Sequence, residues 1–174
     1  MPESEIAAQF SQALLKGNGL KGAHCIHERW MRGAMSVHIE AQLAKLWLHA
    51  PDSIPEWLPT QFIEWLPLVY EVTELFRPAQ KGRSNIYLAL LDYCDSRPDH
   101  FGVYVGMTSH PPALRFDQHK AGIRASGSVL KRGLELLAGP TLHLQGIRSA
   151  DAALIEEQLA EALRARGLLV QGGH

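Results

Sequence analysis

Two short apolar runs with strand-forming composition constrain the fold of this chain most. Residues 86–91 are Ile-Tyr-Leu-Ala-Leu-Leu, and residues 101–107 are Phe-Gly-Val-Tyr-Val-Gly-Met. Runs of this kind favour β-strands, and the polar, proline-containing stretch 92–100 between them predicts a hairpin with a long loop. Because strand side chains alternate between faces, Tyr87 and Tyr104 share one face of the sheet if the register allows.

A helix is expected soon after the second strand. Pro111 and Pro112 suit a first helical turn, and Gly122 is a typical residue just beyond a helix end. Arg115 and His119 lie four residues apart on this segment, so their side chains point the same way. The hairpin and this helix therefore supply two phenols, a guanidinium and an imidazole within one short stretch of chain.

The remainder of the second half predicts a small unit in which helices flank a sheet. A helix capped at 126–128 runs through Leu137, residues 141–144 alternate as a third strand, and 149–166 form a long helix. The expected fold class is α/β, of the α+β type: a small three-stranded, mainly antiparallel sheet flanked by helices in the order β-β-α-α-β-α. Residues 168–171 can add a short strand at an edge.

The first half of the chain is predicted to be mostly helical. Its periodic apolar positions predict helices over 5–15, 26–49 and 59–75. With a linker at 78–82, we expect two domains, a helical N-terminal region over 1–80 and an α/β domain over 81–174. The role of the helical region stays open: it packs on the second domain, or it mediates self-association or contacts with a protein partner.

Composition favours a small cytoplasmic protein. The chain has 174 residues, enough for one or two domains with their own cores. Its two cysteines, Cys25 and Cys94, exclude a disulfide scaffold and favour a cytosolic setting. The acidic start lacks the apolar run of a signal peptide, and no segment has the roughly 20 uninterrupted apolar residues of a membrane span. We therefore expect no membrane partner.

Charge is distributed unevenly between the two halves. Residues 1–80 contain six basic and nine acidic side chains, whereas residues 81–174 contain eleven basic and nine acidic ones. The candidate nucleic-acid-binding residues are Lys120, Arg124, Lys131 and Arg132, which could follow a phosphate backbone. A sequence pI of about 6.8 is low for a strong nucleic-acid binder, so either binding is weak or another subunit contributes charge.

Several short features follow one another in the second half of the chain. They are Asn85-Ile86-Tyr87, Val103-Tyr104-Val105-Gly106, the Arg115 and His119 pair, and Glu156 between Ile155 and Leu159. With this ordered set, residues 85–157 resemble the GIY-YIG nuclease superfamily. That superfamily includes homing endonucleases, some restriction enzymes and the incision subunit of bacterial nucleotide excision repair. The resemblance does not cover the helical N-terminal region.

The resemblance implies a metal-dependent endonuclease, a hydrolase that cuts DNA phosphodiester bonds. The catalytic residues that it implies are Tyr87, Tyr104, Arg115 and His119. It also implies that Glu156 holds one Mg²⁺ or Mn²⁺ ion, with Glu157 as the alternative ligand. The fold implied is the same strand, strand, helix, helix, strand, helix order, and DNA is the partner.

Phosphodiester hydrolysis gives independent reasons for these residue types. It requires a base for the attacking water, positive charge for the phosphate oxygens and stabilisation of the leaving oxygen. Arg115 can clamp the phosphate through its planar fork, and one carboxylate with several waters suits Mg²⁺. A tyrosine base needs a pKa lowered from its reference value of about 10, with His119, of reference pKa near 6.5, as its helper.

Each of these residues also has an ordinary explanation. A tyrosine on a strand is commonly a packing residue, and arginine and histidine on a helix often form a solvated face. Pairs of opposite charge four residues apart explain most glutamates on helices. The alternative function is therefore a catalytically weak or inactive module of this fold that binds nucleic acid or a protein partner.

Overall fold

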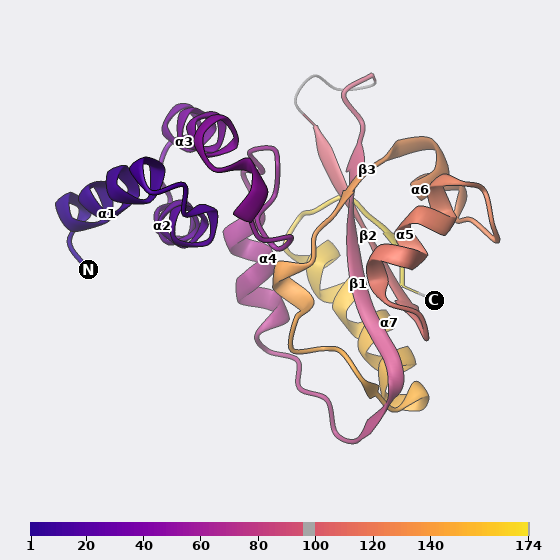
Figure 1. Ribbon diagram of the computed structural model, residues 1–174. Helices are drawn as coiled ribbons and strands as arrows, with labels where there is room; N and C mark the ends of the chain where they lie inside the picture. The colour runs from indigo at the N-terminus through magenta and orange to yellow at the C-terminus, as the bar shows by residue number, and fades with distance from the viewer. Residues whose placement is uncertain (96–99, 174) are drawn as a thin grey trace. The chain divides into compact units, whose positions relative to one another are not determined.

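The chain forms two compact units, Met1–Pro67 and Leu68–His174, in a computed structural model that describes residues 1–95 and 100–173 (Figure 1). Residues 68–80, which we grouped with the helical region by sequence, belong to the second unit. Residues 96–99 of the expected hairpin loop lie outside the described residues. Among those that are described, no helix is long and apolar enough to cross a membrane.

The first unit is built from helices α1 (Glu3–Leu15), α2 (Gly19–Met31) and α3 (Ser36–His49). The single helix predicted over 26–49 is therefore two helices. Gly33 explains the break, because its positive φ of 82° cannot continue a right-handed helix. Trp30 anchors the core of the unit: its ring is buried and its indole N–H donates to the Ile63 carbonyl at 3.1 Å.

The second unit contains the predicted hairpin. Strand β1 (Lys81–Asp92) pairs antiparallel with β2 (Phe101–Thr108). Tyr87 lies opposite Gly106, and Tyr104 lies opposite Ala89. Because Tyr87 and Ala89 are two residues apart on one strand, this register places both tyrosines on the same face, as the alternation predicted.

The predicted three-stranded, mainly antiparallel sheet in the order β-β-α-α-β-α was wrong. In the described part of the chain the sheet is mixed and has four strands in the order β3-β1-β2-β4. Strand β3 (Gly133–Leu136) pairs antiparallel with β1, and β4 (Val170–Gly172) pairs parallel with β2. The parallel pairing is possible because α7 (Ser149–Ala165) precedes β4 and carries the chain back across the sheet.

The third strand lies earlier in the chain than predicted. Helix α6 (Gly127–Arg132) has only six residues, and the chain then passes directly into β3. Residues 141–144, predicted as a strand, instead form the last residue of a 3₁₀ turn at Gly139–Thr141, which contains Pro140, and the bend that follows it. Proline fixes its own φ and lacks the N–H that a ladder needs, which favours the turn.

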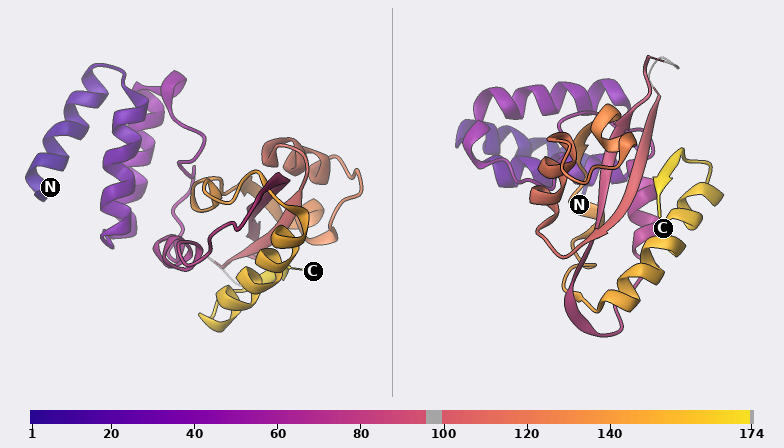
Figure 2. Two further views of the ribbon diagram at one scale, coloured as in Figure 1. Left: turned by 90° about the horizontal axis from the view of Figure 1, so that it is seen from below. Right: turned by 90° about the vertical axis from the view of Figure 1, so that its right-hand side faces the viewer.

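Helices cover both sides of the central strands. Helix α5 (Pro112–Lys120) and α6 lie on one side of β1 and β2, and α7 lies on the other (Figures 1 and 2). Residues 86–91 of β1 are accordingly buried on both faces, which is why they form a continuous apolar run rather than an alternating one. Helix α4 (Leu66–Thr73) precedes the sheet in sequence.

Candidate active site

Tyr87 is a buried phenol that lies flat against the neighbouring strand. Its side chain is only 2% exposed, and it comes from the middle of β1. A Cβ atom at Gly106, directly opposite, would be 2.5 Å from the Cζ and Oη atoms of Tyr87. Glycine is therefore required at this position by close packing with the Tyr87 ring.

Gly106→Ala is expected to lower the free energy of unfolding by about 1–3 kcal/mol, the usual cost of overpacking a core. The added methyl group must displace either the Tyr87 ring or the β2 backbone. Urea denaturation measures the effect. Gly127→Ala is the matched control, because a Cβ there meets no atom within 4 Å and should leave stability nearly unchanged. Equal stability of the two variants would contradict the packing explanation.

His119 is hydrogen bonded through both ring nitrogens. It is 1% exposed, and its Nε2 lies 2.7 Å from Tyr87 Oη. Its Nδ1 accepts the backbone N–H of Ser126 at 2.9 Å. Because Nδ1 accepts, the neutral ring carries its proton on Nε2, and that proton is donated to the Tyr87 oxygen. The Tyr104 ring lies beside both, with centroids 5.9 Å from that of Tyr87 and 5.6 Å from that of His119.

Burial keeps both members of this pair neutral. The pKa of His119 is lowered to about 4, first by burial and second by the charge of Arg115. The pKa of Tyr87 is raised, chiefly by burial and further by Tyr104 and Glu156, with Arg115 opposing. The sequence hypothesis of a base with a lowered phenol pKa therefore does not suit Tyr87. Tyr104, which is half-buried, is the remaining candidate of the two.

His119 is expected to make the protein less stable in mild acid. Its pKa is near 6.5 in the unfolded chain and about 4 in the folded one, so between these values only the unfolded state binds the proton. The stabilisation is complete above pH 6.5 and is lost as pH falls toward 4, by about 3 kcal/mol in total. Urea denaturation from pH 7 to 4.5 measures how steeply the free energy of unfolding changes with pH. This slope should be smaller in His119→Gln than in the wild type by about 1.4 kcal/mol per pH unit. An unchanged slope would contradict the assigned effect of His119.

Arg115 on α5 binds the loop that follows its own helix. Its Nη1 donates to the Ile123 carbonyl at 3.1 Å and to Gln118 Oε1 at 3.3 Å, and its Nη2 donates to the Arg124 carbonyl at 2.7 Å. Arg124 is held at a positive φ of 46°, which few non-glycine residues adopt. The Arg115 charge nevertheless lowers the pKa of both Tyr87 and His119, so it acts on the tyrosine site as well as on the loop.

Glu156 and Glu157 are neighbours on α7 but face different surroundings. Glu156 is 4% exposed, and its charge raises the pKa of Tyr87. Glu157 is exposed to solvent. A carboxylate is a hard oxygen ligand of the kind that suits Mg²⁺ or Mn²⁺, so a metal ion at Glu156, with Glu157 as the alternative, stays a prediction. No group of three or more His, Cys, Asp or Glu side chains that could hold a metal is found in residues 1–95 and 100–173.

Three of the four candidate nucleic-acid-binding residues are exposed around α5 and α6. They are Lys120, Arg124 and Lys131. Lys120 Nζ donates to the Leu130 carbonyl at 3.3 Å, so it also joins the two helices. Their contact with a nucleic-acid phosphate backbone stays a prediction. All three side chains are exposed, so a charged ligand can reach them.

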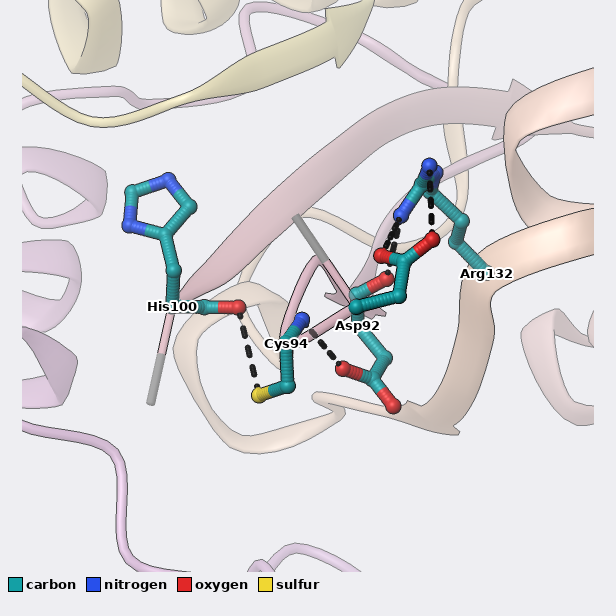
Figure 3. A network of polar contacts seen from close by, with 5 residues as sticks. Asp92, Cys94, His100 and Arg132 are labelled. Atoms are coloured by element: carbon teal, nitrogen blue, oxygen red, sulfur yellow. Dashed lines mark hydrogen bonds and ion pairs between the residues drawn. The ribbon is translucent and has the colours of Figure 1, made fainter. Parts of the chain in front are cut away.

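Arg132, the fourth, contacts the hairpin end of the sheet. It forms an ion pair with Asp95 at 2.7 Å, donates to the Asp92 carbonyl at 3.0 Å and lies over the Tyr93 ring, 4.3 Å from its centroid. Figure 3 shows the hydrogen bond from Arg132 to the Asp92 carbonyl together with the Cys94 N–H, which donates to the Asp92 carboxylate at 2.8 Å. Arg132 therefore has a structural role that its sequence position did not indicate.

Gln171 and Gly172 lie at the site and were not predicted as part of it. Gln171 pairs with Tyr104 in the parallel ladder of β4 and β2, so its side chain lies on the Tyr104 face of the sheet. A Cβ at Gly172 would contact the Val105 carbonyl and lie 2.9 Å from the Tyr104 ring. No local sequence pattern indicates that Gln171 lies beside Tyr104, because this pairing depends on the crossover through α7.

Comparisons with protein-family models, with curated proteins and with solved structures find no match to this chain. The assignment of a function therefore rests on the residues of the site and on their geometry.

Proposed function

We propose that the second unit is a metal-dependent endonuclease that hydrolyses DNA phosphodiester bonds at the Tyr104 face of the sheet. The observation that carries this proposal is geometric: His119 Nε2 lies 2.7 Å from Tyr87 Oη, and the Tyr104 ring lies beside both, so the hairpin and α5 bring two phenols and an imidazole together. Arg115, on the same helix as His119, adds the positive charge that phosphate oxygens need.

Each side chain then has a separate task. Tyr104 acts as its phenolate: its own proton leaves to solvent, and Oη then takes the proton of the attacking water, a role that suits the less buried phenol. The hydrogen-bonded pair of His119 and Tyr87 holds the ring face against which Tyr104 packs. Arg115 binds a phosphate oxygen through the guanidinium N–H groups that do not donate to the loop carbonyls. Glu156 holds one Mg²⁺ or Mn²⁺ ion, which would supply positive charge for the leaving oxygen.

The DNA backbone is proposed to run over α5 and α6. Lys120, Arg124 and Lys131 would neutralise successive phosphates there, so binding should weaken as salt increases. With only three such side chains, affinity is expected to be modest. We also propose a cytoplasmic location, which the unbridged thiols of Cys25 and Cys94 support.

Incubation of the full chain with supercoiled, branched and single-stranded DNA tests the proposal. With Mg²⁺ or Mn²⁺, nicked or linear product is expected from at least one substrate, and EDTA should abolish it. The reaction is followed on agarose and denaturing gels beside a nuclease that cuts all three. If none of the substrates is cut while the control nuclease cuts them, the proposed activity is wrong.

The second candidate is a nucleic-acid-binding module without turnover. One observation favours it: the guanidinium of Arg115 already donates to two loop carbonyls. These contacts leave fewer N–H groups for a phosphate. Salt-dependent retention on DNA without cleavage would support this candidate. Absence of retention at low salt would exclude both.

A further inference from the structure

Helix α3 has apolar side chains on two opposite sides. One side, with Ile39, Leu43 and Leu46, is buried in the core of the first unit. The other side is exposed and consists of Val37, Ala41, Ala44 and Leu48, of which Val37 is 58% and Leu48 is 75% exposed. An ordinary surface helix has a polar outer side, so this one is built like a helix with a second packing partner.

The spacing of the exposed apolar residues matches a two-stranded coiled coil. Positions 37, 41, 44 and 48 are separated by four, three and four residues, which is the alternating d and a pattern of a heptad repeat. The two central positions are alanines, whose small side chains let two helices approach closely. The valine and leucine at the ends provide the larger apolar contacts. The stripe therefore fits another helix of the same kind.

Charges on the two flanks of the stripe indicate how that helix is oriented. Glu40 precedes the Ala41 position and Lys45 follows Ala44, so they stand on opposite flanks, five residues apart, and both are exposed. Neither belongs to an ion pair within the described part of the chain. In a parallel, in-register coiled coil, a residue at position g of one helix faces the residue five positions later, at position e, on the partner helix. Glu40 of each copy would then face Lys45 of the other.

An antiparallel arrangement of the same stripe lacks this complementarity. The flank with Glu40 would then face the same flank of the partner, which presents Trp47, and Lys45 would face His38. The charges thus favour the parallel arrangement, and they favour a second copy of this chain over an unrelated helix.

We propose that the exposed side of α3 pairs with the same side of a second copy, in a parallel, in-register dimer with twofold symmetry. Such an interface is isologous, so the two Glu40–Lys45 contacts form together. Two heptads bury less than the roughly 1,200 Å² of stable interfaces, which makes the dimer weak and dependent on concentration. The proposal is independent of the proposed nuclease activity, because it rests on the first unit alone.

Sedimentation equilibrium of the full chain over a wide concentration range tests the dimer. Reversible dimerisation is expected for the wild type, and Ala44→Glu should weaken it at least tenfold, since it places two like charges at the seam. Ala8→Glu, on the exposed side of α1, is the matched control and should leave the dissociation constant unchanged. A wild type that stays monomeric throughout overturns the proposal, as does equal weakening by both variants.

Charge reversal tests the orientation. Glu40→Lys and Lys45→Glu should each weaken the dimer several-fold, because each places like charges opposite one another. The double variant should recover the wild-type dissociation constant, and high salt should reduce all these differences. Neither residue has an opposite charge four positions away within α3, so the recovery cannot arise inside one helix. A double variant no better than the single ones would overturn the parallel arrangement.

Discussion

Tyr104→Phe is expected to reduce the rate of DNA nicking by about 10²–10⁴-fold, the usual contribution of a positioned proton acceptor. Tyr87→Phe should reduce it far less, by about tenfold or under, although both changes remove one phenolic oxygen. The reason is burial: Tyr87 is 2% exposed, its pKa is raised, and its oxygen already accepts the His119 Nε2–H. A water molecule can be activated only by the phenol that it can reach.

The loss of folding stability, unlike the loss of activity, should be larger for Tyr87→Phe than for Tyr104→Phe. Tyr87→Phe leaves the buried His119 Nε2–H without its acceptor, which costs about 1–3 kcal/mol. Tyr104→Phe removes a hydroxyl from a half-buried ring and should cost less. Single-turnover nicking rates and urea denaturation of the same preparations separate the two effects. If Tyr87→Phe loses as much activity as Tyr104→Phe at full stability, the assignment of the base to Tyr104 is wrong.

The part of the site that could be predicted from sequence is the part made of local pattern. The hairpin follows from two apolar runs, and the shared face of Tyr87 and Tyr104 follows from the period of a strand. The four-residue spacing of Arg115 and His119 likewise follows from the period of a helix. These features depend on neighbours in the chain, which a sequence contains directly.

The part that could not be predicted depends on contacts distant in sequence. Strand β3 was missed because its four residues lie directly after α6 and carry too short an alternation to be distinguished from that helix. The place of Gln171 beside Tyr104 requires the parallel pairing of β4. Parallel pairing has no local signature, because its partner strand lies on the other side of a crossover.

The protonation states could not be predicted for a related reason. The expectation of a histidine near pKa 6.5 assumed solvent around His119, whereas its ring is enclosed and accepts the Ser126 N–H. Ser126 was noted only as a candidate helix cap, and its side chain makes no cap hydrogen bond. The sequence thus indicates the candidate groups, whereas the burial that keeps Tyr87 and His119 neutral depends on how the folded chain packs.

Glu156→Gln is expected to abolish metal-dependent nicking, with a loss of about 10³-fold or more. The amide keeps the shape of the side chain but loses the negative charge that attracts a divalent cation, and a metal ion at a leaving oxygen is worth several kcal/mol. Glu157→Gln is the matched control, since it makes the same chemical change one residue away on the exposed side of α7. It should retain nearly the wild-type rate.

Binding of Mn²⁺ followed by electron paramagnetic resonance gives a measurement that does not depend on turnover. The wild type and Glu157→Gln should bind one ion, and Glu156→Gln should bind at least tenfold more weakly, because the amide lacks the negative charge that attracts the cation. Glu156→Gln should also lower the pKa of Tyr87, because the Glu156 charge raises it. If Glu156→Gln cuts DNA at the wild-type rate, or if Glu157→Gln is the variant that loses the ion, then Glu156 is a buried structural carboxylate and the metal must be held elsewhere.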